Sequence, residues 1–249
     1  MTQGYRQSHV STDSASRYDR RYSEKNHEAM LWSLEQSLLL QELTRLRARK
    51  PRIEYLDFAC GTGRLLSFLE SRVEKAVGIE IAENMLSVAR GKVESAQLIC
   101  KDITVESGPP EARYDLITAF RFLLNAEPSL RLAALKALAR RLRDRGSRLI
   151  VNNHNNLPSY RIIAWPLHRL RQSVTGTPKP NYLSRRQIKS IFEMAGLELI
   201  ATHGYGQFSA HVVNLLSLGR LRDLESALVD APLLWRFATH QMYVARLQN

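Results

Sequence analysis

Short apolar runs alternate with helix-length segments between residues 53 and 152, and this alternation limits the fold more than any other feature of the sequence. Runs of this length are typical of buried strands, and we expect strands at 53–59, 76–81, 96–101, 114–120 and 148–152. The intervening helices are predicted at 62–71, 82–93 and 128–143. Strands and helices that alternate at this spacing form right-handed βαβ units. The sequence therefore predicts an α/β fold with a doubly wound, mostly parallel sheet.

A further helix is predicted ahead of this region, over residues 26–49. Its leucines recur every three or four positions, and Pro51 blocks its continuation. Residues 1–25 are polar and form an N-terminal extension. We expect the extension and the helix, residues 1–50, to precede a central sheet region at 51–153.

The alternation breaks at residues 154–183, which contain four prolines. We predict that this segment is a lid inserted over the sheet edge after the fifth strand, with a short helix at 162–172. Ser184 and Gln187 then form a capping box that opens a helix through Ala195. The C-terminal part, 184–249, is completed by a strand at 197–202, a helix at 212–229 and a strand at 242–247. No linker or internal repeat divides the chain, so 1–249 is predicted to be a single domain.

The two cysteines exclude a disulfide scaffold and a cysteine zinc site, because Cys60 and Cys100 stand 40 residues apart without a CxxC partner. They favour a reducing compartment, and we expect a cytoplasmic protein without a metal site. Cys100, in a short strand, is predicted to be in the core. No stretch approaches the roughly 18 apolar residues of a membrane helix. The first 30 residues lack the apolar segment of a secretory signal.

The charge is strongly positive, +12, and unevenly spread. Residues 146–192 contain no Asp or Glu but carry eight Lys and Arg side chains, among them Arg161 and Arg171. This pattern favours a surface that faces an anionic partner, such as a small molecule, a glycan, a glycolipid, nucleic acid or a membrane surface. The alternatives are a general contribution to solubility, or neutralisation by acids from elsewhere in the fold.

A glycine-rich turn follows the first predicted strand, in the run Leu56-Asp57-Phe58-Ala59-Cys60-Gly61-Thr62-Gly63. The end of a strand is where a doubly wound fold binds nucleotides. The third glycine of a dinucleotide turn is absent, because Leu66 stands there, and Asp57 would repel a phosphate. Further acids follow the next two strands, Glu80 and Asp102. The pattern predicts a nucleoside ligand that carries no phosphate and some positive charge.

The run Leu56–Gly63 resembles motif I of the class I S-adenosylmethionine-dependent methyltransferases. The segments around Glu80, Asp102 and Tyr114-Asp115-Leu116-Ile117 resemble the following motifs of that family. The resemblance covers residues 50–152 and implies a Rossmann-like methyltransferase fold, with S-adenosylmethionine as the cofactor and S-adenosylhomocysteine as the product. One departure is Ala59, where the first motif glycine usually stands. Alanine is tolerated there if the residue has a negative φ.

The resemblance also implies a role for each matching residue. Asp57 would favour the cofactor ammonium, Glu80 would accept from both ribose hydroxyls, and Asp102 would accept from the adenine amino group. Ile81 and Met85 would flank the adenine. The remaining expected cofactor contacts are the backbone of Ala59, Cys60, Gly61 and Gly63, with Ile103 and Phe120. Tyr18 and Tyr22 are expected either to close over the ligand or to be surface aromatics.

The methyl acceptor should bind past the ends of the fourth and fifth strands. There, Arg121 is expected either to hold an anionic acceptor or to pair with a nearby acid. His154 is expected either to act as general base or to be a hydrogen-bonded turn histidine. Asn153 beside it, and Arg161 and Arg171 in the lid, complete the predicted acceptor site.

The fourth strand lacks the Asp/Asn-Pro-Pro-aromatic motif of base N-methyltransferases, since Ala119-Phe120-Arg121-Phe122 stands there. Neither cysteine stands where the RNA cytosine C5 enzymes need a nucleophile. The region is instead similar to bacterial methyltransferases of surface-polysaccharide and glycolipid clusters. The leading hypothesis is O-methylation of an anionic small molecule, glycan or glycolipid. The alternatives are an RNA-modifying methyltransferase and a non-catalytic partner subunit with the same fold.

Overall fold

The structure is a computed structural model of the chain, and it describes residues 27–105, 112–154, 183–206 and 238–249. In these residues seven strands form one sheet in the order β3-β2-β1-β4-β5-β7-β6. The strands are β1 (Glu54–Phe58), β2 (Lys75–Glu80), β3 (Gln97–Cys100), β4 (Leu116–Ala119), β5 (Arg148–His154), β6 (Leu197–Tyr205) and β7 (His240–Leu247). The helices are α3 (His27–Arg47), α4 (Arg64–Leu69), α5 (Glu83–Arg90), α6 (Pro128–Arg141), α8 (Arg185–Met194) and the 3-10 turn η1 (Glu70–Arg72).

Neighbouring strands from β3 through β5 pair in parallel, whereas β7 runs antiparallel to both β5 and β6. The predicted doubly wound, mostly parallel sheet is therefore confirmed. Because β1, β2, β4 and β5 run in the same direction, their carboxyl ends meet at one edge of the sheet, called the carboxyl edge below. The glycine-rich turn after β1 lies at this edge.

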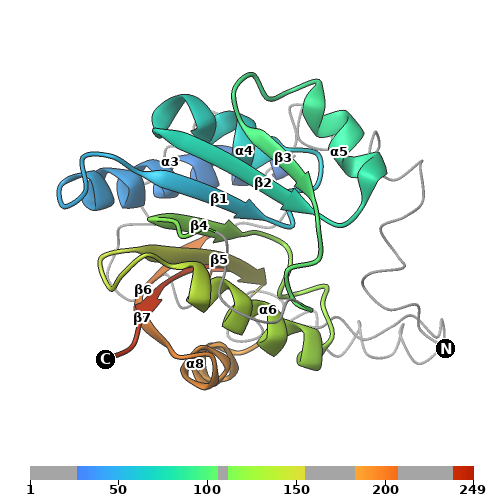
Figure 1. Cartoon of the computed structure of the whole chain (residues 1–249). Helices are drawn as coiled ribbons and strands as arrows, with labels where there is room; N and C mark the ends of the chain where they lie inside the picture. The colour runs from blue at the N-terminus through green and yellow to red at the C-terminus, as the bar shows by residue number, and fades with distance from the viewer. Residues whose placement is uncertain (1–26, 106–111, 155–182, 207–237) are drawn as a thin grey trace, which may run out of the picture.

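Helices cover both faces of the sheet, as Figure 1 shows, with α3, α4 and α5 on one side and α6 and α8 on the other. Alternate residues of each strand point to opposite faces. Leu56 of β1 thus joins the core that α6 and α8 cover, whereas Tyr55 joins the core beneath α3 and α4. These two layers are called the α6 face and the α3 face below.

Three strands extend further than their apolar runs predict. β5 continues to His154, β6 continues to Tyr205 and β7 begins at His240, because the antiparallel ladders of β7 pair these polar residues by their backbones. The predicted helix 62–71 is divided into α4 and η1. The capping box at Ser184 and Gln187 is confirmed. The predicted extension 1–25, the lid helix 162–172 and the helix 212–229 lie outside the described residues.

Cys60 is buried, but the prediction that Cys100 is in the core is wrong, because β3 is the outermost strand of the sheet and Cys100 is exposed there. Both cysteines are free thiols. Within the described ranges, no helix combines the length and the apolar character that crossing a membrane requires. Nor does that part of the chain gather three or more His, Cys, Asp or Glu side chains that could hold a metal ion.

A buried carboxylate fixes the chain ahead of β3. Glu70 accepts hydrogen bonds from the backbone N–H groups of Glu94, Ser95 and Ala96, at 2.9–3.1 Å, and from the Ser95 hydroxyl. Burial disfavours the charged form of Glu70, but these donors outweigh burial and lower its pKa. The charged carboxylate therefore stabilises the entry into β3 above the pKa of an unfolded glutamate.

We expect Glu70→Ala to lower the free energy of unfolding by about 2–3 kcal/mol, because four donors lose a charged acceptor. The loss should be largest near neutral pH and should shrink as the pH falls through the lowered pKa of Glu70, where the wild-type carboxylate is protonated. Urea denaturation at several pH values measures it. Glu74→Ala, at an exposed residue of the same connection, is the matched control and should cost less than about 0.5 kcal/mol. Equal losses in the two variants would contradict this role.

Candidate functional site

The glycine-rich turn between β1 and α4 places three residues in the left-handed region, with φ of +55° at Ala59, +55° at Gly61 and +77° at Gly63. The negative φ under which alanine would be tolerated at position 59 is therefore not found. The turn is held by backbone hydrogen bonds from Cys60 N to the Ile79 oxygen and from Gly63 N to the Cys60 oxygen. This geometry demands a positive φ at position 59, and alanine meets it at a cost in backbone strain.

Glu80, the last residue of β2, holds the turn from the neighbouring strand. One carboxylate oxygen accepts from Gly61 N at 3.0 Å, and the other accepts from Ile81 N at 2.8 Å and Ala82 N at 3.1 Å. Only 5% of Glu80 is exposed. Glu80 therefore joins the predicted cofactor turn to the segment that follows β2.

Asp57 is buried on the α3 face. The Thr118 hydroxyl donates to Asp57 Oδ1 at 2.7 Å, so the Tyr55 hydroxyl, 2.7 Å from Thr118 Oγ1, donates to Thr118 in turn. Burial raises the pKa of Asp57 to about 7, although the Thr118 hydrogen bond and the Arg64 cation oppose the shift. An anionic Asp57 at this position calls for a cationic partner.

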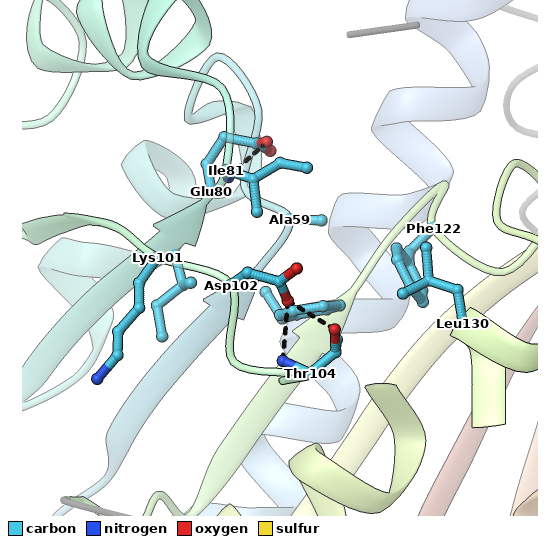
Figure 2. A pocket seen from close by; sticks show the side chains of 10 residues that line it. Ala59, Glu80, Ile81, Lys101, Asp102, Thr104, Phe122 and Leu130 are labelled. Atoms are coloured by element: carbon cyan, nitrogen blue, oxygen red, sulfur yellow. Dashed lines mark hydrogen bonds between the residues drawn. The ribbon is translucent and has the colours of Figure 1, made fainter. Parts of the chain in front are cut away.

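A small pocket opens beside the turn. Its wall includes four of the predicted cofactor residues, namely Ala59, Glu80, Ile81 and Asp102. Figure 2 shows Phe122 and Leu130 across the pocket from Glu80 and Ile81, while the Lys101 ammonium points away from the other labelled side chains. Asp102 Oδ1 accepts from both the backbone N–H and the hydroxyl of Thr104. The sequence did not predict the lining residues Phe58, Ile79, Lys101, Thr104, Phe122 and Leu130.

Asp57, Cys60, Gly61 and Gly63 do not line this pocket, and three further predicted cofactor residues are buried away from it. Ile103 is 1% exposed and belongs to the core of the α6 face, Met85 packs with Ala82, and Phe120 belongs to the core of the α3 face. Periodicity does not separate a residue that packs inward from one that packs against a ligand. The predicted residues Tyr18, Tyr22, Arg161 and Arg171 lie outside the described residues.

The predicted acceptor residues gather at the carboxyl edge, past β4 and β5. Arg121 has a φ of +59°, and its backbone N–H donates to Asn152 Oδ1 at 2.6 Å. Asn153 Nδ2 donates to the Leu183 oxygen at 2.8 Å, which ties β5 to the start of α8. His154 ends β5 and pairs with His240 of β7. It is therefore a strand residue and not the turn histidine of the alternative interpretation.

The sequence analysis missed a buried polar cluster centred on Glu35 of α3, which is 0% exposed. Its carboxylate accepts from Tyr205 Oη at 2.7 Å and from Asn152 Nδ2 at 3.1 Å, and it pairs with Arg64 at 3.2 Å. The Arg64 guanidinium also lies 4.1 Å from the ring centre of Trp32. A sequence signal was available, because Glu35 lies on the apolar stripe of the helix and not on its solvent face.

The sequence matches the methyltransferase domain family over residues 31–202, more than half of the chain. The chain therefore belongs to this family. The match begins in α3 and ends in β6, so it includes the glycine-rich turn, Glu80, Asp102 and the predicted acceptor residues. No match is found among curated protein sequences.

Solved structures show the same fold. The magnesium protoporphyrin IX methyltransferase of Synechocystis PCC 6803, with bound S-adenosylhomocysteine, is 15% identical with a TM-score of 0.62, over 94% of each chain. With bound S-adenosylmethionine it is 14% identical with a TM-score of 0.62, over 100% of this chain and 99% of that one. A S-adenosylmethionine-dependent methyltransferase from Clostridium acetobutylicum ATCC 824 is 14% identical with a TM-score of 0.58, over 86% of this chain and 91% of that one. Family and fold together confirm the predicted class I S-adenosylmethionine-dependent methyltransferase.

The two glycines of the turn provide a matched test of its packing. A Cβ at Gly61 would meet no atom within 4 Å, whereas a Cβ at Gly63 would lie 3.0 Å from Ala89 Cβ of α5. We expect Gly61→Ala to cost about 1–2 kcal/mol of backbone strain. Gly63→Ala should cost about 1–3 kcal/mol more, because it also crowds α5. Chemical denaturation of both variants measures the difference, and equal costs would contradict the packing described.

Glu35 should also be needed for stability. We expect Glu35→Gln to lower the free energy of unfolding by about 3–5 kcal/mol, because it removes the buried negative charge that pairs with the partly buried Arg64 guanidinium. Glu28→Gln, on the same helix but partly exposed, is the control and should change stability by less than about 0.5 kcal/mol. A Glu35→Gln variant as stable as the control would show that the cluster does not hold α3 to the sheet.

Proposed function

We propose that this chain binds S-adenosylmethionine along the carboxyl edge and O-methylates an anionic small molecule, glycan or glycolipid. The observation that carries the proposal is the row of acids at the ends of neighbouring strands. Asp57 lies one residue before the end of β1, Glu80 ends β2 and Asp102 follows β3, with the glycine-rich turn between the first two. A nucleoside that carries an amino acid presents an ammonium, ribose hydroxyls and an adenine amino group in just such a series.

The residues of the turn fit this ligand. The open space at Gly61 lets a ligand approach the backbone. Asp57 is proposed to bind the ammonium, since a buried carboxylate needs a cation. Glu80 uses three of its roughly four acceptor positions within the protein, and its remaining capacity is proposed for the ribose.

The adenine is proposed to lie against the apolar wall of Ile81, Phe122 and Leu130, with Asp102 accepting from its amino group. When bound, S-adenosylmethionine supplies a methyl group on a sulfonium that a nucleophile can displace. The protein must align the acceptor on the far side of that methyl group and exclude water. Arg121, Asn153 and His154 at the ends of β4 and β5 are proposed to face the acceptor.

Cations at the same edge support an anionic acceptor. Arg185 and Arg186 open α8 directly after Leu183 and Ser184, and the Leu183 carbonyl is tied to Asn153. The cations of the acid-free stretch 146–192 do not all face the acceptor side unpaired, however. Arg148 begins β5, at the opposite edge of the sheet, and Lys189 pairs with Glu193 at 3.6 Å. We include a cytoplasmic location in the proposal, because both cysteines are free thiols.

The acceptor class is testable by fractionation. Purified protein and S-adenosylmethionine labelled in its methyl group are incubated with separate lipid, glycan, RNA and small-molecule fractions. We expect label in the glycan, glycolipid or anionic small-molecule fraction, and the transfer should weaken as salt screens the acceptor. Label in RNA would replace this acceptor with the RNA alternative. S-adenosylhomocysteine binding without label in any fraction would favour the non-catalytic subunit.

Asp57 makes cofactor affinity depend on pH. Because its pKa without ligand is about 7, an ammonium ligand must displace a proton below that pH. We expect S-adenosylhomocysteine to bind more tightly at pH 8 than at pH 6, by several-fold to about tenfold. Calorimetry across this range measures the effect, and Asp57→Asn should bind weakly with a flat profile. The free energy of unfolding of the ligand-free protein should instead decrease from about pH 4 to 7, because folded Asp57 retains its proton there. A flat wild-type affinity profile would remove Asp57 from the ammonium site.

A further inference from the structure

Three rings meet at the carboxyl edge where β5, β6 and β7 lie together. The His154 and His240 rings stand edge to face with centroids 4.5 Å apart, and His240 stacks on Tyr205 at 5.4 Å. His240 is 5% exposed, whereas His154 is partly exposed. The adenine pocket does not include this cluster.

The hydrogen bonds around His240 fix which ring nitrogen carries its proton. The Thr239 hydroxyl donates its only proton to the Gly206 carbonyl at 2.7 Å. Thr239 Oγ1 lies 2.9 Å from His240 Nδ1 and therefore accepts from it. The neutral imidazole is thus protonated at Nδ1, and its basic lone pair lies on Nε2.

Close packing encloses the Nδ1 side of the ring. Gly206 has a φ of +74°, and a Cβ there would lie 3.0 Å from His240 Nδ1 and 2.8 Å from Leu31 Cδ2 of α3. No side chain but hydrogen fits at that position. The packing therefore closes Nδ1 to a bound molecule, and Nε2, on the far side of the ring, is the nitrogen at which a proton could be exchanged.

The strand register places His240 on the same sheet face as Asp57. Asp57 pairs with Thr118 across β1 and β4, and their side chains are hydrogen-bonded on the α3 face. Asn152 of β5 contacts Glu35 on that face, and His154, two residues on, points the same way. His240 stands directly opposite His154. One face thus carries the proposed ammonium site at β1 and a histidine pair at β5 and β7, past which the acceptor is proposed to bind.

We propose that His240 Nε2 takes the proton from the acceptor hydroxyl during methyl transfer, an inference that rests on the proposed function. In this step an oxygen lone pair of the acceptor forms the bond to the methyl carbon. The carbon–sulfur bond breaks and its electron pair stays on sulfur, which gives S-adenosylhomocysteine. The hydroxyl proton moves to His240 Nε2 and passes to water after the product leaves.

The groups that face His240 suit this role. His154 from β5 is close enough that two positive rings would repel each other, so a proton on one ring disfavours a proton on the other. Tyr205 from β6 is no proton source, because burial and the Glu35 carboxylate hold its pKa well above the ordinary value. Thr239 and Leu31 do not titrate. The rate should therefore rise with pH as the pair loses its proton.

The test compares His240→Gln, His154→Ala and a pair of variants at Thr239. Methyl transfer is measured with labelled S-adenosylmethionine and the fraction that the wild type methylates, from pH 5.5 to 9. We expect His240→Gln to lower kcat about 10²–10⁴-fold and to abolish the pH-dependent rise, with S-adenosylhomocysteine affinity unchanged. His154→Ala should retain the rise. Thr239→Val, which removes the acceptor of the Nδ1 proton, should lower kcat, whereas Thr239→Ser should not.

Nitrogen NMR of labelled histidine reads the tautomer independently of any acceptor. We expect His240 protonated at Nδ1 in the wild type and in Thr239→Ser, and a mixture of tautomers in Thr239→Val. Wild-type kcat and pH profile in His240→Gln, or an Nε2-protonated ring in the wild type, would overturn the assignment while leaving the proposed function intact. If the wild type methylates no fraction, the proposed function and the role of His240 in it both fail. If His240→Gln no longer binds S-adenosylhomocysteine, the kcat values of Thr239→Val and Thr239→Ser test the assignment instead.

Discussion

A buried carboxylate that lacks hydrogen-bond donors destabilises a fold. Glu35 is subject to this constraint, and the contacts that satisfy it organise the α3 face. Its donors come from three different elements, α4, β5 and β6, so that its charge is compensated only when all three are in place. The attraction of opposite charges thus fixes α3 over the sheet with an orientation that apolar packing alone would not define. The same contact aligns Arg64 at the first turn of α4, directly after the glycine-rich turn.

Arg64 links the two halves of the site. Its guanidinium pairs with Glu35, and its positive charge also opposes the rise in the pKa of Asp57. One cation therefore serves a carboxylate that holds the helix and a carboxylate proposed to hold the ligand. The electrostatic state of the cofactor end consequently depends on a helix that lies outside the βαβ units.

The parts of the fold that local patterns govern could be predicted from the sequence. The apolar runs located β1 to β5, the Ser184 capping box located α8, and the acids Glu80 and Asp102 emerged at one pocket. What could not be predicted depends on contacts between distant segments. The positive φ at Ala59 follows from the turn closing on β2, and the end of β5 at His154 follows from pairing with β7. The role of Glu35 could not be predicted, because the donors to an acid on an apolar stripe come from segments that meet only in the folded chain.

The two faces of the sheet contribute different kinds of side chain to the carboxyl edge. The α6 face supplies Phe58 and Phe122, whose rings meet at 5.0 Å, to a pocket with apolar walls suited to a flat base. The α3 face carries Asp57, Thr118 and Asn152, which are hydrogen-bonded to partners in other elements, and His240, whose ring packs against His154 and Tyr205. The proposed methyl transfer needs apolar side chains against the adenine and polar groups that balance charge and transfer protons. A sheet whose strands alternate sides supplies both within one row of strand ends, because neighbouring residues of each strand serve opposite faces.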